Sequence, residues 1–244
     1  MNFRGEWLLV WIMLRLFSSP AMAEEGKLKT TLSAGLTLTS GNSETLQANA
    51  SLVSEGESKG FGSVRFGAEA NYGENTMNDE SETTVKNIKG FGNGKKTLSE
   101  KTFAYLDLSA LNDDIASIDY RVSVGPGAGL YLIKKDSSKL SVETGLSYVW
   151  EEVSEIKDDY LTVRLSQRFD HQFSETAKIW QSLEYLPKLN DFENHLINAE
   201  AGAEAALNSK INLRLVLQDR YDSKPAENVK KNDLSLIAGI SLNM

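Results

Sequence analysis

The chain has 244 residues, with 26 Lys and Arg against 34 Asp and Glu, two His and no Cys. Without cysteine there are no disulfides, no thiolate metal site, no cysteine nucleophile and no lipid-bearing cysteine. The net charge of −8 argues against nucleic acid as a partner, because binding to phosphates requires clustered Lys and Arg. The sequence also contains no stretch of about 20 apolar residues that could cross a bilayer as a helix.

The N-terminal segment has the pattern of an export signal. Arg4 supplies positive charge, residues 8–17 form a short apolar core, and Ala21-Met22-Ala23 is a small-residue cleavage site. We expect residues 1–23 to be a cleaved signal peptide and residues 24–244 to form one domain. The alternative, a retained amphipathic anchor, is disfavoured because the cleavage site lies where a signal peptidase requires it.

Apolar and polar residues alternate from residue 28 to the C-terminus. Leu32 and Leu36 occupy even positions of the first segment, for example, while Ser33 and Thr37 occupy odd ones. Successive side chains of a strand point to opposite faces, so each such segment has one apolar face. Strands are predicted at residues 28–38, 46–52, 64–72, 83–93, 102–110, 120–126, 140–150, 161–169, 177–185, 197–205, 211–217 and 234–244. The segment 83–93 alternates weakly and is included because an even strand count requires it.

Polar clusters separate these segments. They predict turns or loops at residues 40–43, 73–82, 112–114, 134–139, 151–159, 208–210 and 222–232. Twelve strands within residues 24–244 leave about 18 residues for each strand and its connection. This spacing is typical of an all-β, transmembrane, antiparallel up-and-down β-barrel of about 12 strands, with ten strands as the alternative.

The polar faces carry many charges, which favours a barrel in lipid over a soluble sandwich because lipid would direct these faces into a lumen. A closed barrel also satisfies every backbone group in the membrane. We expect Arg164 and Arg168 to face Glu184, and Glu200 and Glu204 to face Arg214. The predicted lumen charge network comprises Glu143, Arg164, Arg168, Glu184, Glu200, Glu204 and Arg214. These charges either neutralise one another and plug the lumen or line a narrow pore.

Aromatic residues of outward parity lie near strand ends that would share one membrane interface. Such residues form girdles in outer-membrane barrels; the predicted girdle comprises Tyr72, Tyr120, Trp150, Tyr185 and Tyr221. Acidic residues concentrate in the connections 73–82 and 151–159 at the same, outer side. Glycines within strands are expected to mark bends, bulges or crowded positions beneath large lumen side chains.

Several stretches together resemble one family. They are Ser40-Gly41-Asn42-Ser43-Glu44, residues 120–129 (YRVSVGPGAG), residues 219–223 (DRYDS) and Lys231-Asn232-Asp233. They are similar to the salt-induced outer-membrane proteins, a domain family without an assigned function. The resemblance covers essentially residues 24–244 and implies an outer-membrane β-barrel of a Gram-negative cell, with no family substrate, cofactor or catalytic residue. Such barrels usually end in an aromatic residue, whereas this chain ends in Met244.

The two histidines raise two alternatives. His171 with Ser174 and Asp170 would suit a barrel hydrolase acting on lipids, but Asp170 has the opposite parity. His195 near Asp191 and Glu193 would suit a metal, although a solvated interfacial histidine is favoured.

We therefore expect a monomeric barrel of the cell outer membrane, with no enzymatic activity, cofactor or metal. Its expected role is structural or that of a narrow channel, linked to salt or envelope stress. The expected partners are outer-membrane lipid, lipopolysaccharide and the barrel-assembly machinery. A lipid hydrolase and a soluble periplasmic β-barrel that binds a ligand are the alternatives.

Overall fold

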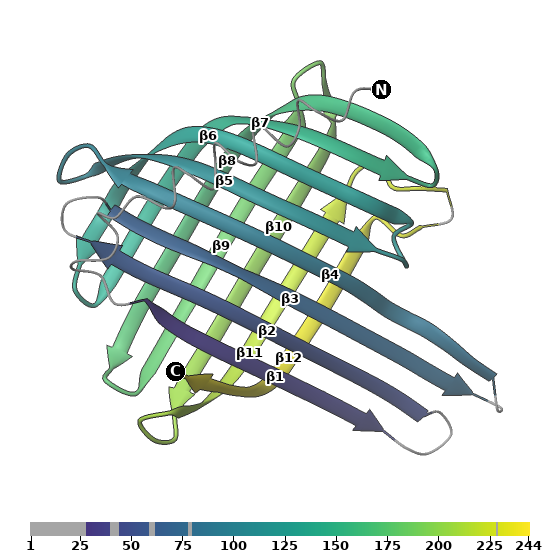
Figure 1. Ribbon diagram of the computed structural model, residues 1–244, viewed down its shortest axis with the longest axis horizontal. Coiled ribbons are helices and arrows are strands. Elements are labelled where there is room, and N and C mark those ends of the chain that lie inside the picture. Colours follow the sequence, from purple (N-terminus) through teal and green to yellow (C-terminus); the bar gives the residue numbers. More distant parts are fainter. Residues whose placement is uncertain (1–27, 40–43, 59–61, 78–79, 228) are drawn as a thin grey trace.

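A computed structural model describes residues 28–39, 44–58, 62–77, 80–227 and 229–244. Its strands form one closed antiparallel barrel in which each strand pairs with the next and β12 pairs with β1 (Figure 1). The described residues contain no helix that is long and apolar enough to cross a membrane. The strands are β1 (Lys29–Thr39), β2 (Glu44–Ser58), β3 (Gly62–Met77), β4 (Glu80–Thr97), β5 (Thr102–Asp113), β6 (Ile118–Lys135), β7 (Ser138–Val153), β8 (Ile156–Ser174), β9 (Ala177–Lys188), β10 (Asp191–Ala206), β11 (Ile211–Asp222) and β12 (Asn232–Asn243).

The predicted all-β barrel of twelve strands is confirmed. The weakly patterned segment 83–93 is part of β4, which pairs with β3 and β5 along most of its length. Its alternation is weak because small residues, Gly90 and Gly92, occupy outward positions where other strands carry larger apolar ones. The predicted signal peptide and the turn at residues 40–43 lie outside the described residues.

The alternation of the sequence places apolar residues outside and polar ones inside. In β1, Leu32 and Leu36 are exposed on the outer face, whereas Ser33 is buried on the inner face. Odd-numbered residues face the lumen along most of β1 to β7. From β8 to β11 the even-numbered residues do so, as the buried Arg164 on β8 and Trp180 on β9 illustrate.

The strands continue past the apolar segments, so the connections are shorter than predicted. Residues 73–82 and 151–159, expected to be loops, lie mostly on the ends of β3, β4, β7 and β8. Strand pairing extends into these segments because backbone hydrogen bonds can continue in water without an apolar face on the strand. The β7–β8 hairpin closes with Val153 paired to Ile156. Ser154 and Glu155 both have positive φ, at 51° and 67°, as a two-residue type I′ turn requires.

Aromatic side chains in one half of the barrel pack against glycines of neighbouring strands. Phe103 is the register partner of Gly129, Tyr105 of Gly127, Trp180 of Gly202 and Phe91 of Gly67. A Cβ on Gly129 or Gly202 would overlap the ring of its partner. These glycines therefore let large rings pack along the wall instead of across the lumen, in agreement with the expected crowded positions.

The junction between β1 and β12 is the shortest in the barrel. These strands pair only from Thr31 with Asn243 to Ala34 with Ile240, whereas β1 and β2 pair along the whole of β1. Figure 1 shows the two strands diverging away from this short paired region.

Candidate functional site in the barrel lumen

The lumen contains a cavity of about 960 Å³. We call the end of the barrel at the β6–β7 and β8–β9 turns, where β12 also ends, the inner mouth, and the opposite end the outer mouth. The cavity is lined from Ser137 and Thr176 at the inner mouth to Arg121 and Arg220 near the outer mouth. Its wall carries nearly equal numbers of acidic and basic side chains. The lumen is therefore polar and nearly neutral overall.

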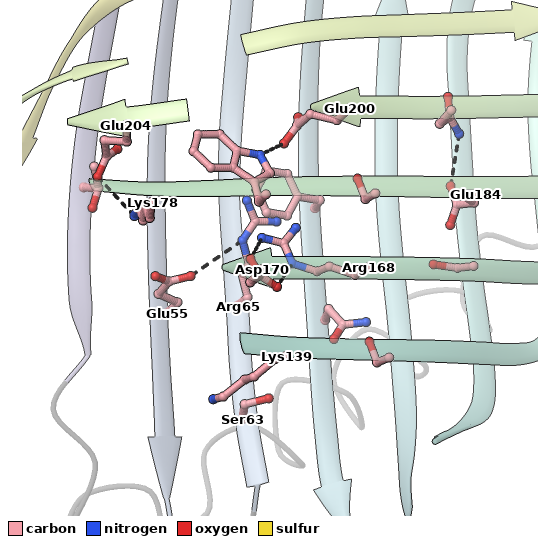
Figure 2. A pocket seen from close by; sticks show the side chains of 18 of the residues that line it. Glu55, Ser63, Arg65, Lys139, Arg168, Asp170, Lys178, Glu184, Glu200 and Glu204 are labelled. Atoms are coloured by element: carbon pink, nitrogen blue, oxygen red, sulfur yellow. Dashed lines mark hydrogen bonds and ion pairs between the residues drawn. The ribbon is translucent and has the colours of Figure 1, made fainter. Parts of the chain in front are cut away.

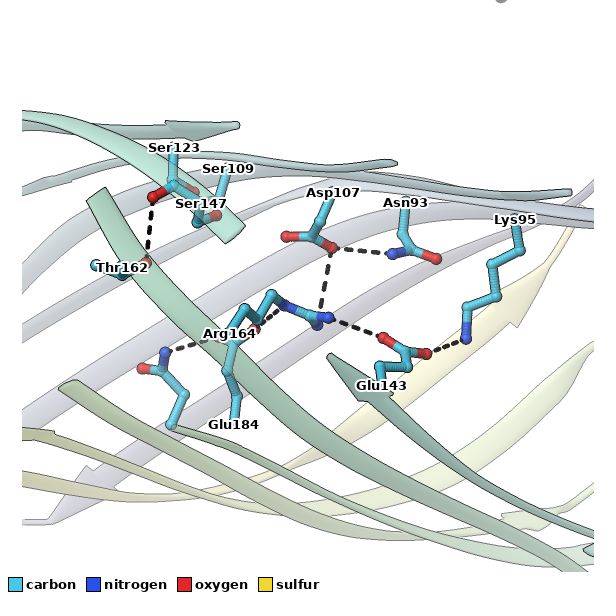
Figure 3. A network of polar contacts seen from close by, with 11 residues as sticks. Asn93, Lys95, Asp107, Ser109, Ser123, Glu143, Ser147, Thr162, Arg164 and Glu184 are labelled. Carbon is cyan, nitrogen blue, oxygen red and sulfur yellow. Dashed lines mark hydrogen bonds and ion pairs between the residues drawn. The ribbon is translucent and has the colours of Figure 1, made fainter. Parts of the chain in front are cut away.

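Arg164 of β8 is the centre of a buried ion-pair network, which we call the Arg164 hub (Figure 3). Its Nη1 lies 2.8 Å from Glu143 of β7, and its Nε lies 2.6 Å from Glu184 of β9. Asp107 of β5 is 4.0 Å from Nη2, and Lys95 of β4 binds Glu143 at 2.5 Å. The hub therefore connects five strands through charges that water reaches poorly, which strengthens their attraction.

Ion pairs cross the lumen at the outer mouth. Arg121 of β6 lies 2.5 Å from Glu151 on the neighbouring β7 and 3.3 Å from Asp222 of β11. Arg220 of β11 lies 3.9 Å from Asp113 of β5. Because β11 is on the far side of the barrel from β5 and β6, two of these pairs bridge opposite walls. The cavity ends at this layer, which we call the outer ion-pair layer.

The inner half of the lumen also carries charged side chains. Figure 2 shows Arg65 of β3 and Arg168 of β8 pointing toward one another from different walls. Each has its own carboxylate, with Arg65 at 3.8 Å from Glu55 and Arg168 at 2.7 Å from Asp170 on the same strand. At the inner mouth Lys139 reaches Glu57 at 3.0 Å, and both side chains are largely exposed.

The structure brings Glu143, Arg164 and Glu184 of the predicted network together. Arg168 donates to both carboxylate oxygens of Asp170 instead of pairing with Glu184. The remaining members have other partners: Glu200 accepts from Trp180 and Gln218, Glu204 pairs with Lys178, and Arg214 donates to Ser33. Arg214 is the register partner of Glu204, but its Nη1 donates to Ser33.

Sequence reasoning missed Lys95, Asp107 and every member of the outer ion-pair layer. The inward parity of these residues was readable, but, apart from the Arg121–Glu151 pair, their ion-pair partners lie on non-neighbouring strands. Such contacts depend on the tilt and stagger of the closed barrel, which alternation does not reveal.

The predicted girdle residues lie on the outer face toward the outer mouth. Tyr72, Tyr120 and Trp150 are exposed. Tyr185 and Tyr221 flank Ile197 in one register row, and the ring of His195 lies 5.3 Å from Tyr185 and 5.8 Å from Tyr221. His195 thus belongs to an aromatic cluster at the outer mouth. The described residues contain no group of three or more His, Asp or Glu placed to hold a metal.

The residues of the hydrolase alternative are not assembled. His171 Nδ1 shares a 2.7 Å hydrogen bond with Ser138. Ser174 contacts Thr176, and Asp170 accepts from Arg168. A catalytic triad requires that the histidine activates the serine and that the carboxylate orients the histidine. His171 therefore has neither relation, with Ser174 or with Asp170.

Comparison with known proteins supports a barrel without assigning an activity. A family model described as "Protein of unknown function, DUF481" matches residues 32–242. No curated protein matches the chain. The NanC porin structure is similar, with a TM-score of 0.53 and 9% identity, covering 88% of this chain and 100% of that chain. The KdgM porin has a TM-score of 0.47 and 8% identity, and the match covers 89% of this chain and 99% of that chain. The translocator domain of the autotransporter NalP from Neisseria meningitidis has a TM-score of 0.46 and 13% identity, and the match covers 97% of this chain and 96% of that chain. The likeness to NanC shows a porin-like barrel fold.

Proposed function

The chain belongs to the DUF481 family, and we propose that it forms a narrow, charge-lined channel of the cell outer membrane. The observation that carries this proposal is the polar cavity of about 960 Å³ inside a closed barrel. Water and small ions are the solutes that such a space fits, since both signs of charge line its wall.

The outer face supports a membrane location. Leucines are exposed on many strands, including Leu52, Leu146, Leu165 and Leu215. A soluble monomer rarely exposes so continuous an apolar surface, which disfavours the soluble ligand binder. Outer-membrane lipid and lipopolysaccharide would then surround the barrel, and the barrel-assembly machinery would insert it. One chain closes the barrel by itself, so a monomer is the proposed oligomeric state.

The outer ion-pair layer would limit conduction. Its cross-lumen contacts are long, at 3.3 Å and 3.9 Å, so ions that enter the cavity at high concentration would compete with these contacts for the charged groups. We propose that conductance therefore rises with ionic strength more steeply than the conductivity of the solution. This dependence would give a physical basis for a link to salt stress.

Single-channel recording in planar bilayers tests the proposal. The double variant Asp113→Asn/Asp222→Asn removes one partner of each cross-lumen pair, so we expect it to open more often than the wild type at 0.1 M salt. Its conductance should also follow solution conductivity more closely. Heat-modifiable migration on gels establishes that each protein is a folded barrel.

The matched control is Glu152→Gln. Glu152 also forms an ion pair near the outer mouth, with Lys157. The Lys157 side chain is highly exposed, and the pair joins neighbouring strands. We expect conductance like that of the wild type. Folded barrels that stay silent in all three forms at every salt concentration would contradict the channel and leave a structural role.

A further inference from the structure

The barrel wall opens where β1 and β12 part. Their register ends at Ala34 with Ile240, although β1 continues to Thr39 and β12 begins at Asn232. Gly35 and Gly239 lie at the point of divergence. A Cβ on Gly239 would overlap the Ala34 carbonyl and approach Gly35 Cα. The two backbones therefore cross closely there and separate toward the outer mouth.

Side-chain exposure marks the same opening. Leu36 on β1 is 61% exposed, and Leu234 and Leu236 on β12 are 64% and 63% exposed. Other outward leucines in mid-strand positions, such as Leu213 and Leu215, are exposed by less than half. The difference follows from the missing neighbour strand, whose side chains would otherwise cover part of each leucine.

A small cavity of about 30 Å³ lies at the wall at this place. Its lining includes outward residues, Ala34, Ala50 and Ile240, together with inward ones, Asn49 and Gln218. The outward part of the lining is apolar, and the inward part combines polar residues with the apolar Val216 and Ile237. An amphiphile is the class of molecule that matches such a lining.

Arg214 provides the charge for the polar end of an amphiphile. It lines this cavity together with Glu69, the acidic residue there. Arg214 Nη1 donates to Ser33 at 3.2 Å, while its Nε is buried without a hydrogen-bond partner. A buried unpartnered donor on a cation favours an anionic acceptor. The space holds only one or two water molecules, which fits a carboxylate better than a lipid phosphate headgroup.

We propose that the opening between β1 and β12 binds a long-chain carboxylate from the membrane, with its headgroup at Arg214 and its alkyl chain in the lipid beside Leu36, Leu234 and Leu236. The site would give amphiphiles a lateral route between the lipid and the lumen. This inference goes beyond the proposed ion channel and needs only that the barrel lies in a membrane.

Photolabelling tests the site. The full chain is placed in phosphatidylcholine nanodiscs with palmitate carrying a diazirine in its alkyl chain, and adducts are mapped by mass spectrometry. We expect adducts to concentrate on β1 and β12, and unlabelled palmitate to compete for the site. Arg214→Gln should reduce labelling there about tenfold, as the loss of a charge-assisted hydrogen bond predicts. Arg214→Lys should retain part of it.

The absence of cysteine allows a matched pair of cross-links. A disulfide in Leu36→Cys/Ala238→Cys would close the opening, and we expect labelling to fall on oxidation and return on reduction. The control Leu32→Cys/Leu242→Cys joins residues that are already register partners but do not line the cavity, and it should leave labelling unchanged. Heat-modifiable migration confirms folding of every variant.

Three results would overturn the inference: adducts spread evenly around the outward face, equal labelling in Arg214→Gln, or equal labelling by an alkylammonium diazirine of the same chain length. Conductance is recorded on the same proteins. A silent barrel that labels at the β1–β12 opening contradicts only the channel, whereas a conducting barrel without such labelling contradicts only the carboxylate site.

Discussion

The two halves of the lumen are stabilised by different interactions. From the Arg164 hub to the outer mouth, ion pairs join strands that are not neighbours, and two of them cross between opposite walls. In the inner half, rings such as Phe103 and Trp180 pack against glycines of adjacent strands. The first arrangement places charges across the lumen, while the second keeps the aromatic rings against the wall.

This difference explains where the cavity lies. Cross-lumen pairs need side chains that reach the barrel axis, so the outer mouth has little free space. Rings packed on glycine stay near the wall, where they take little space from the lumen. Both arrangements support the barrel, but only the ring–glycine contacts do so without placing side chains across it.

The largest expected effect is from Arg164→Met. It leaves the buried Glu143 and Glu184 without their common partner, and breaking a buried pair costs about 3 kcal/mol or more. We expect the free energy of unfolding, measured by urea titration in lipid vesicles, to fall by that amount. Lys139→Met at the inner mouth should change it by less than about 1 kcal/mol, because exposed pairs contribute little. Equal losses in the two variants would contradict the comparison.

An intermediate effect is expected from Gly202→Ala. The new methyl would overlap the Trp180 ring, which must then leave the wall, and overpacking of this kind costs about 1–3 kcal/mol. The same titration measures the loss. Gly90→Ala is the control, since a Cβ there has no neighbour within 4 Å, and its stability should be unchanged. A stable Gly202→Ala would show that the inner half does not depend on ring packing.

The smallest effect concerns an exposed pair beyond the outer ion-pair layer. Lys224 Nζ lies 2.6 Å from Asp191, and the hydrogen bond it donates holds the pKa of Asp191 below its usual value. Its contribution to stability is present above the unfolded pKa and is lost as pH falls through the folded one. In Lys224→Ala we expect the Asp191 pKa, followed by NMR, to rise toward the ordinary value, with no measurable change in unfolding. An unchanged pKa would contradict this assignment.

The sequence alone predicted the strand number and the face to which Leu32, Ser33 or Arg164 points, because alternation directly encodes the two faces of a strand. It overestimated the connections at 73–82 and 151–159, since polar strand ends beyond the apolar belt resemble loops in composition. It also gave no indication of the pair between Arg220 and Asp113. That contact joins residues far apart in the chain and on opposite walls, and it follows from barrel closure rather than from any local pattern.

The Ser154–Glu155 turn has a consequence for how the molecule meets its surroundings. Hairpins that close in two residues present rigid strand ends, which do not enter a protease active site because proteases bind extended, unpaired chain. Among the described residues, the connection 223–231 is the longest on that side. Limited proteolysis of intact cells would therefore cut in this connection before the β7–β8 hairpin, which would also report on which side of the barrel faces the medium.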